Sequence, residues 1–536
     1  MSKFLNGLTN ATNYTMTENG AVAYKSTRSM LLDMFAMGAA YRTRSDEDCI
    51  VLFDNAFKED PLNALKCLFY IRSIRNGQGE RRFFRVVMKW LATQYPDTVR
   101  ANLAEIVAHG RWDDLYTLCD TPVEADMFAF MKRQFVLDAS SKTPSLLAKW
   151  LKSENTSSKE SVKLAKKTIK YFEITPRQYR KILSMLRERI KVLERLMSAK
   201  RWDEIEFDKI PSRAGMIYRN AFARHDVERM KMATMDSLVS YKDFAKDTTT
   251  KVNAKALYPY ECVAEALKLF RTGSYYSMRN LPPMDDTQRL MVNKYWDNLT
   301  DYFKGASFNG IAVVDTSGSM VSSSASAPIN VAISLGLYTA EKAKGPFAGH
   351  YISFASRPQL IKTEGVDFCD KVQRIYRTNL VDNTNIEATF DLLLDTAIRN
   401  NCSQDEIPQN VIVISDMEFD RCAINNNMFN GGSWRSLSNN YLSKNNMETL
   451  FEVIEKKWAA HGYKLPHLIF WNVQARQNNI PMIGVGNVSY VSGFSPSIFE
   501  QIMTGKTGYD LMMDKLNSAP FKNIKLPNNF KLKAVF

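Results

Sequence analysis

The sequence predicts a multidomain protein in which an α-helical region is followed by an α/β doubly wound domain. The chain has 536 residues, well beyond the roughly 250 to 300 at which a single hydrophobic core stops growing. In residues 1–304, apolar residues recur at three- and four-residue spacing, as in amphipathic helices. In residues 305–536, short apolar runs alternate with helical segments, which is typical of a parallel sheet wrapped by helices.

The composition is that of a globular protein. Hydrophobic residues make up 45% and charged residues 24% of the chain, which excludes global disorder and a fibrous fold. No apolar run approaches the roughly 20 residues that a bilayer requires, and the first residues lack the apolar segment of a signal peptide. The seven cysteines are scattered without a Cys-x-x-Cys pair, which indicates reduced thiols. We therefore expect a cytoplasmic protein with no membrane partner.

The helical region is expected to be an array of stacked helix pairs joined by short polar breaks. Its clearest helix starts at Thr175, which offers an N-cap, followed by Pro176 at the first helical position and Gln178 three residues after the cap. An apolar stripe continues from there to Met197. The pattern predicts one helix over this whole stretch, with a basic face opposite the packed one.

The second region is expected to contain a sheet. Short apolar runs predict strands at 311–315, 351–354, 411–416, 468–471 and 482–485, separated by helices at about 330–344, 385–400 and 447–461. Residues 421–446 are rich in Asn, Ser and Gly, and they predict a mobile insertion at the carboxyl end of a strand. This insertion is either a surface loop or a lid over the ligand-binding edge of the sheet.

Oxygen-bearing side chains follow the first predicted strand directly. Asp315, Ser317 and Ser319 alternate along a glycine-containing loop and offer hard ligands, which suit Mg²⁺ or Mn²⁺ rather than zinc. The alternative is a helix-capping loop that binds no metal. A metal-dependent hydrolase is less favoured, because the sequence has no Gly-x-Ser-x-Gly motif and no histidine near this loop.

This Asp-x-Ser-x-Ser arrangement resembles the metal-ion-dependent adhesion site of von Willebrand factor A domains. Residues 383–388 (NTNIEA) resemble the threonine loop of that family, and residues 413–416 (VISD) resemble its aspartate-bearing strand. The resemblance implies a metal site formed by Asp315, Ser317, Ser319, Thr384 and Asp416. It further implies that the hydroxyls contact the cation, that the aspartates hold it through water or hydrogen bonds, and that a partner's carboxylate fills an open position.

A basic stretch in the helical region forms the second candidate site. Residues 159–213 hold 16 basic and 8 acidic residues, more than half of the net charge of +14 of the whole chain. Such a surface attracts phosphate backbones, and aromatic side chains on it could stack unpaired bases. The candidate nucleic-acid contacts are Arg180, Lys181, Arg187, Lys191, Arg195, Lys200 and Arg201. The alternative is a solvated helix face with its aromatics in the core.

The whole chain resembles a HEAT-like helical-repeat region followed by a von Willebrand A domain, as in the TROVE (Ro autoantigen) family of RNA-binding proteins. It is more similar to an uncharacterised family related to them, on residues 69–81 (FYIRSIRNGQGER), 110–115 (GRWDDL) and 415–420 (SDMEFD). The resemblance implies a non-enzymatic RNA-binding scaffold with a Mg²⁺ site, and in the Ro family the repeats close into a ring. The alternative function is a metal-dependent module that captures an acidic side chain of a protein partner.

Overall fold

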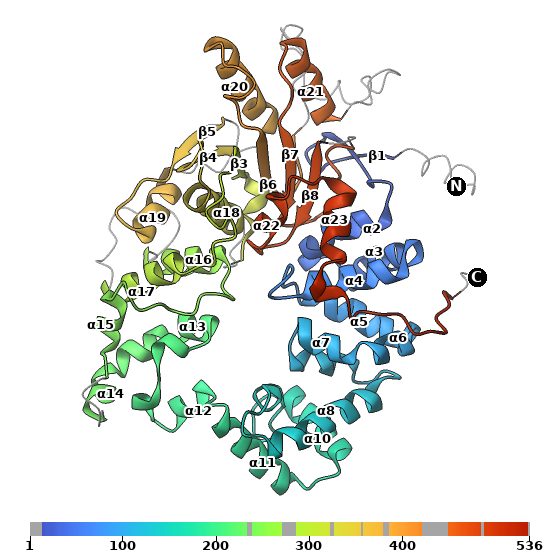
Figure 1. The fold of residues 1–536 in the computed structure, drawn as a ribbon, viewed down its shortest axis with the longest axis vertical. Helices are drawn as coiled ribbons and strands as arrows, with labels where there is room; N and C mark the ends of the chain where they lie inside the picture. Colours follow the sequence, from blue (N-terminus) through green and yellow to red (C-terminus); the bar gives the residue numbers. More distant parts are fainter. Residues whose placement is uncertain are drawn as a thin grey trace, which may run out of the picture.

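The fold is that of a computed structural model, which describes residues 13–232, 238–270, 286–321, 326–354, 357–378, 385–420, 449–483 and 487–533. Figure 1 shows a helical region that leaves a sheet domain, curves away from it and returns to it. None of the helices in these ranges combines the length and apolar character needed to cross a membrane. The predicted fold class, a helical region followed by an α/β doubly wound domain, is confirmed.

The helical region begins with a hairpin of two short strands and continues as a series of helices. Its elements are β1 (Tyr14–Met16), β2 (Val22–Tyr24), α2 (Met30–Met37), η1 (Gly38–Thr43), α3 (Asp46–Glu59), α4 (Pro61–Arg72), α5 (Arg82–Gln94), α6 (Pro96–Ala101), α7 (Leu103–His109), η2 (Trp112–Leu118), α8 (Glu124–Ser140), α9 (Leu147–Trp150), α10 (Lys159–Phe172), α11 (Pro176–Arg189), α12 (Leu193–Ser198), η3 (Trp202–Glu204), η4 (Phe207–Lys209), α13 (Ser212–Arg224), α14 (Asp226–Met232), α15 (Tyr241–Lys246), α16 (Pro259–Phe270) and α17 (Asp286–Asp297). Some of these helices start at a side chain that caps them: Ser45 forms a capping box at α3, and Asp60 caps α4 ahead of a proline.

The predicted start of the helix at Thr175 is confirmed, with a capping box between Thr175 and Gln178. The prediction of one continuous helix to Met197 is wrong, because α11 ends at Arg189 and α12 begins at Leu193. Between them Lys191 has a φ of 47°, in the left-handed region that a right-handed helix cannot include. The basic residues before and after this break therefore lie on different helices.

The sheet domain is built on six strands in the order β5-β4-β3-β6-β7-β8, parallel except for the antiparallel pair β4 and β5. The strands are β3 (Gly310–Asp315), β4 (His350–Phe354), β5 (Gln359–Lys362), β6 (Asn410–Ser415), β7 (His467–Asn472) and β8 (Val488–Ser492). The helical elements are η5 (Gly318–Met320), α18 (Pro328–Lys342), α19 (Phe368–Thr378), α20 (Ile386–Arg399), α21 (Leu450–Ala460), α22 (Ile498–Ile502), α23 (Gly508–Leu516) and η7 (Ala519–Phe521).

Helices cover both faces of the sheet, as expected for a doubly wound domain. Val314 and Ile414 point to the face packed by α18, whereas Val313 and Val413 point to the face packed by α20 and α21. This alternation follows from the two-residue period of a strand. Because helices cover both faces, the polar residues that follow the strands lie at the edge of the sheet.

Residues 482–483 of the strand predicted at 482–485 are not part of a strand, and residues 484–485 lie outside the described residues; the strand that the structure describes nearby is β8 at Val488–Ser492. Its serines made it look less apolar than the preceding run, yet Ser489 and Ser492 are buried in the sheet, and Ser489 Oγ lies 3.0 Å from His467 Nε2. The edge strand β5 was not predicted because most of its side chains are exposed. The insertion expected at 421–446 lies outside the described residues.

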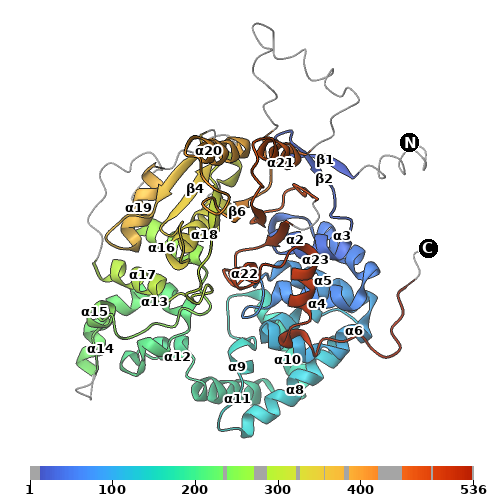
Figure 2. The same ribbon diagram turned by 45° about the horizontal axis from the view of Figure 1, so that its top comes forward.

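The loop between α4 and α5 joins the two ends of the helical region to the sheet domain, which closes the ring seen in Figures 1 and 2. The Tyr258 hydroxyl, just before α16, donates to the Gln78 carbonyl oxygen at 3.2 Å. Ser497 Oγ, just before α22, donates to the Gly77 carbonyl oxygen at 3.1 Å. Gln78 Nε2 in turn donates to the Tyr70 hydroxyl at 2.7 Å. The first helices, the last helices and the sheet domain thus meet at one buried loop.

The C-terminal segment fastens the sheet domain onto the first helices. Asn102 exchanges two hydrogen bonds with the backbone of Lys525, at 2.7 and 3.1 Å. The Phe521 ring stacks on His109 with 4.9 Å between ring centroids, and Phe530 packs against Phe57. These contacts join residues more than 400 positions apart and make the two regions one interlocked body.

Candidate metal centre and nucleic-acid interface

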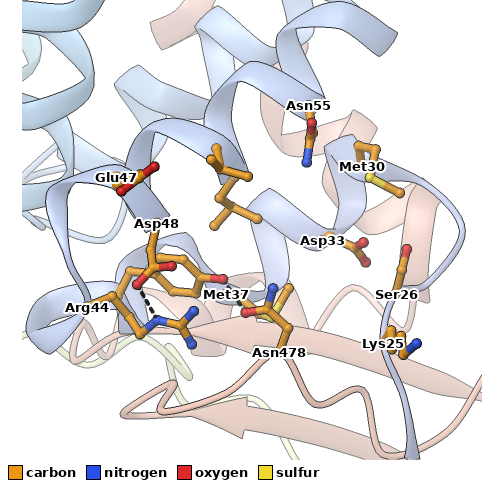
Figure 3. A pocket seen from close by; sticks show the side chains of 13 residues that line it. Lys25, Ser26, Met30, Asp33, Met37, Arg44, Glu47, Asp48, Asn55 and Asn478 are labelled. Carbon is orange, nitrogen blue, oxygen red and sulfur yellow. Dashed lines mark hydrogen bonds and ion pairs between the residues drawn. The ribbon is translucent and has the colours of Figure 1, made fainter. Parts of the chain in front are cut away.

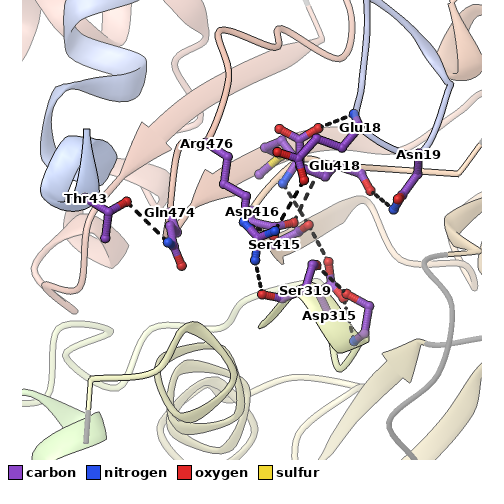
Figure 4. A network of polar contacts seen from close by, with 12 residues as sticks. Glu18, Asn19, Thr43, Asp315, Ser319, Ser415, Asp416, Glu418, Gln474 and Arg476 are labelled. Carbon is purple, nitrogen blue, oxygen red and sulfur yellow. Dashed lines mark hydrogen bonds and ion pairs between the residues drawn. The ribbon is translucent and has the colours of Figure 1, made fainter. Parts of the chain in front are cut away.

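The predicted metal residues of two strands meet at the carboxyl edge of the sheet (Figure 4). Asp315 ends β3, and Asp416 directly follows β6, which pairs with β3 in parallel. Ser415 Oγ donates a hydrogen bond of 2.5 Å to Asp315 Oδ2. Asp315 and Asp416 therefore lie close together, because neighbouring parallel strands end at the same edge of a sheet.

The loop after β3 brings the two serines to the same place. The Ser317 backbone N–H donates to Asp315 Oδ1 at 2.9 Å, and the Ser317 and Ser319 hydroxyl oxygens lie 3.0 Å apart. Asp315 and Ser317 are buried, whereas Ser319 is partly exposed, so the cluster opens to solvent on the side of Ser319. Thr384, the fifth predicted residue, lies outside the described residues.

The donor set fits a hard divalent cation. Asp416 is buried, and its Oδ2 atom accepts no hydrogen bond, while its Oδ1 accepts one from the Glu418 backbone N–H at 3.3 Å. An unsatisfied buried carboxylate oxygen is costly, and a cation would satisfy it. Within the described ranges, no three His, Cys, Asp or Glu side chains are grouped to hold a metal. A cation here would therefore need the hydroxyls of Ser317 and Ser319 as well as the two aspartates.

The electrostatics of the cluster also favour a divalent cation. Burial, reinforced by the neighbouring Asp416, raises the pKa of Asp315 to about 7. Burial also raises the pKa of Asp416, against the opposing effects of a hydrogen bond from Ser319 and the charge of Arg476. Two adjacent buried carboxyls resist ionisation without a counter-charge, and a bound cation would supply one.

Three charged residues that sequence reasoning did not single out surround this cluster. Arg476, after β7, places its Nε 3.5 Å from Asp416 Oδ2 and donates to the Ser319 carbonyl oxygen. A terminal nitrogen of the Arg476 guanidinium lies 3.3 Å from Glu18 Oε2. Glu18 lies on the turn between β1 and β2. The Glu18 backbone N–H donates a hydrogen bond to Glu418 Oε2 at 2.7 Å. The N-terminal hairpin therefore covers this edge of the sheet.

A groove of about 820 Å³ lies between α9, α11, α12 and α13. Its cationic lining residues are Lys149, Arg187, Arg195 and Arg213, its aromatic ones are Trp150 and Tyr218, and its acidic one is Glu194. The Arg111 guanidinium lies 4.1 Å from the centroid of the Trp150 ring. The groove thus combines positive charge with two partly exposed aromatic rings.

Two of the seven predicted nucleic-acid residues line this groove, and they differ in availability. Arg187 donates to the carbonyl oxygens of Ala148 at 2.9 Å and Leu151 at 2.7 Å, and to Ser153 Oγ at 3.0 Å. Its guanidinium caps the end of α9 and is a structural group. Arg195 donates to Ser184 Oγ at 2.7 Å but keeps 40% of its side chain exposed.

The other five predicted residues lie outside the groove lining. Arg180 pairs with Glu154, and Arg201 pairs with Glu188 and Glu204. The remaining three are exposed: Lys181 lies on α11, Lys191 in the break after it, and Lys200 just after α12. The expected single basic face is thus divided by the break after α11.

A second cavity, of about 310 Å³, lies beside α2 and α3 (Figure 3). Its polar groups are engaged by the chain itself: the Thr27 backbone N–H donates to Asp33 Oδ1 at 2.7 Å, and Arg44 Nε donates to Asp48 Oδ2 at 3.0 Å. The Tyr41 hydroxyl donates to Asn478. These satisfied contacts give no reason to place a ligand there.

Comparison with known proteins identifies the family. The sequence matches DUF2828, described as a domain of unknown function, over residues 17–146 and 136–307. The chain belongs to the DUF2828 family. Residues 309–523 of this DUF2828 protein also match DUF7788, a second domain of unknown function. The expectation of an uncharacterised family is confirmed.

Two individual proteins are similar to this DUF2828 chain over most of its length. "Uncharacterized protein L728" of Acanthamoeba polyphaga mimivirus is 29% identical over 534 residues, which cover 92% of this chain and 85% of the relative. The crystal structure of the Ro (RSR) protein of Deinococcus radiodurans aligns with 92% of this chain and 99% of its own, at 12% identity and a TM-score of 0.37.

Sequence signals existed for some of the residues that were missed in this DUF2828 protein. Ser415 belongs to the same strand end as Asp416, and Arg476 follows the next strand, so the edge-of-sheet argument could have included both. Glu18 had no signal, because it reaches the site from almost 300 residues away along the chain.

Proposed function

We propose that this protein is a non-enzymatic RNA-binding scaffold that holds single-stranded RNA in the groove between α9, α11, α12 and α13. The observation that carries the proposal is the lining of this groove, where four cationic side chains and two aromatic rings face a single acidic one. Cations bind a phosphate backbone by releasing its counterions. Aromatic rings stack unpaired bases with little regard to sequence.

Side-chain exposure distinguishes the groove residues that we expect to contact RNA. Arg187 is committed to α9, so charge reversal there would damage the fold. Lys149 and Arg195 are partly exposed and lie on different sides of the groove, on α9 and α12. Arg195 pairs with Glu188 at 3.4 Å, but both side chains of this pair are exposed, so Lys149 and Arg195 are the cations that can turn to a phosphate at modest structural cost.

The test is a charge reversal at both positions, Lys149→Glu with Arg195→Glu. Binding to a fluorescein-labelled single-stranded RNA of 20 mixed nucleotides, measured by anisotropy across a NaCl series, is expected to weaken by about tenfold or more, with a salt slope smaller by about 1.4, the value for two lost phosphate contacts. Lys464→Glu, an exposed lysine of the sheet domain, is the matched control and should bind as the wild type does. Unchanged affinity and slope in the double variant would reject the groove.

We further infer that the carboxyl edge of the sheet binds Mg²⁺ or Mn²⁺, with Ser317 and Ser319 as direct ligands and Asp315 and Asp416 as supporting acids. The support is the buried Asp416 oxygen that accepts no hydrogen bond. A cation held by so few carboxylates keeps affinity for a further anion. The edge is therefore also suited to capture an acidic side chain of a protein partner, which is the second candidate function.

Removal of the first aspartate tests this metal site. Asp315→Ala is expected to weaken Mn²⁺ binding, measured by isothermal titration calorimetry, by about 100-fold or more, since it removes a supporting acid and the hydrogen bonds that position Ser317 and Ser415. Asp395→Ala on α20, an exposed acid of the same domain, is the control. Equal Mn²⁺ affinities in the two variants would contradict the assignment.

A further inference from the structure

The side chain of Arg476 lies beside the oxygen atom that the proposed cation would need. Its guanidinium forms three contacts: Nε is 3.5 Å from Asp416 Oδ2, one terminal nitrogen donates to the Ser319 carbonyl oxygen, and the other is 3.3 Å from Glu18 Oε2. Figure 4 shows Arg476 reaching down to Asp416 and Ser319 with Glu18 above it. Arg476 is the positively charged residue that directly contacts these acids among the described residues.

The backbone holds this arginine firmly in place. Its carbonyl oxygen accepts a hydrogen bond of 2.5 Å from Arg44, and the preceding Ala475 N–H donates to the Ala40 carbonyl oxygen at 3.1 Å. A few residues later, Ile480 and Tyr24 exchange two backbone hydrogen bonds of 2.8 Å. The position of the Arg476 side chain therefore depends on contacts between the sheet domain and the first elements of the chain.

The acids around this guanidinium form two groups. Asp416, with Asp315 behind it, lies on the buried side, where the Asp416 side chain is fully inaccessible. Glu18 lies on the outer side, with 41% of its side chain exposed, and Glu418 is bound between them by the Glu18 backbone and by Asn479 Nδ2 at 2.9 Å. A buried carboxylate needs a counter-charge more than an exposed one, so the inner contact is the stronger reason for Arg476 to be there.

A divalent cation and this guanidinium cannot both neutralise Asp416 at close range, because like charges a few ångströms apart repel strongly in a buried site. We propose that Arg476 is an internal counter-cation that holds Asp416 in the metal-free protein, and that a divalent cation displaces it outwards onto Glu18. This proposal rests on the metal site proposed above. Metal binding would then tighten the contact between Arg476 and the N-terminal hairpin, so the hairpin responds to the metal.

The first test is removal of the competing charge. In the full chain, Arg476→Gln is expected to tighten Mn²⁺ binding about tenfold, because the cation no longer has to displace a guanidinium. Arg399→Gln removes an arginine of the same charge from the exposed surface of α20. This control should change the Mn²⁺ affinity by less than about twofold. Calorimetric titration with MnCl₂ measures all three proteins. An Arg476→Gln affinity that is equal to or weaker than that of the wild type would overturn the proposal.

The second test uses the residue that receives the displaced side chain, and its surface position avoids the risk of misfolding. Glu18→Gln is expected to weaken Mn²⁺ binding about three- to tenfold in the wild-type background and by less than about twofold when Arg476 is already glutamine. Equal effects in both backgrounds would mean that Glu18 acts directly on the metal, which also overturns the proposal. If neither the wild type nor Arg476→Gln binds Mn²⁺, the proposed metal site is wrong. If both bind Mn²⁺ with equal affinity, the metal site stands and only the proposed role of Arg476 is wrong.

Discussion

Replacing Asp114 with alanine is expected to lower the free energy of unfolding by about 3–5 kcal/mol, the usual cost of breaking a buried ion pair. Asp114 is inaccessible to solvent, and its Oδ2 accepts two hydrogen bonds from the buried Arg72, at 2.6 and 2.9 Å. Its Oδ1 accepts a hydrogen bond of 2.7 Å from Arg85. The substitution would leave the Arg72 charge buried without a partner, at the junction of α4, α5 and η2. Urea unfolding followed by circular dichroism measures the loss.

A solvent-exposed pair provides the matched control. Asp126 pairs with Arg100 at 2.7 Å, with 46% and 37% of the two side chains exposed, so Asp126→Ala should cost less than about 1 kcal/mol. The shortest N···O distances of the two pairs are similar, at 2.6 and 2.7 Å, whereas Asp114 is buried and accepts more hydrogen bonds than the exposed Asp126. Similar losses in both variants would show that the Arg72 and Asp114 pair contributes no more than a surface contact.

Much of the fold could be predicted from the sequence because its signals are local. Four of the five predicted strands, including β3 and β6, coincide with apolar runs that the sheet buries on both faces. The strand β8 was missed because two of its residues are buried serines, whose hydrogen bonds to neighbouring elements cannot be read from composition. Strand propensity depends on the residue type alone, whereas the burial of a side chain depends on the elements that pack against it.

The candidate metal cluster was largely predictable, and its surroundings were not. Asp315 and Asp416 follow strands that pair in parallel, and the topology of such sheets brings their ends together. The contact of Glu18 with Arg476 depends on where a hairpin of the first domain docks. No local pattern encodes such a long-range contact, so the pairing of Glu18 with Arg476 could not be predicted from the sequence.

The prediction of a single basic face was wrong because of the backbone conformation of one residue. The spacing of the apolar residues predicted one continuous helix, but Lys191 adopts a positive φ and divides that helix. After the break, Arg195 turns towards the groove that also contains Lys149 and Trp150. Charge composition indicated a basic region of the chain, while the arrangement of its charges depends on how α9, α12 and α13 pack.

Replacing Gly79 with alanine is expected to destabilise the closed ring by about 2–5 kcal/mol, from the strain of a positive φ and from overpacking. Gly79 has a φ of 67°, and a Cβ atom added there would lie 1.8 Å from the Tyr258 hydroxyl oxygen. That hydroxyl donates to the Gln78 carbonyl oxygen across the junction between the two ends of the helical region. The alanine must push Tyr258 away, so hydrogen exchange is expected to rise in residues 254–262, with a lower urea midpoint for the whole chain.

A second substitution separates the overlap from the backbone strain. Tyr258→Phe removes the one atom within 3 Å of the added methyl group, since the next ring atom lies 3.1 Å away. In the wild-type background this change loses a hydrogen bond and should cost about 1 kcal/mol. In the Gly79→Ala background it should restore about 1 kcal/mol or more, so the two effects have opposite signs in a double-mutant cycle. Additive losses would mean that Gly79 is required only for its backbone conformation and that the close approach of Tyr258 does not hold the ring closed.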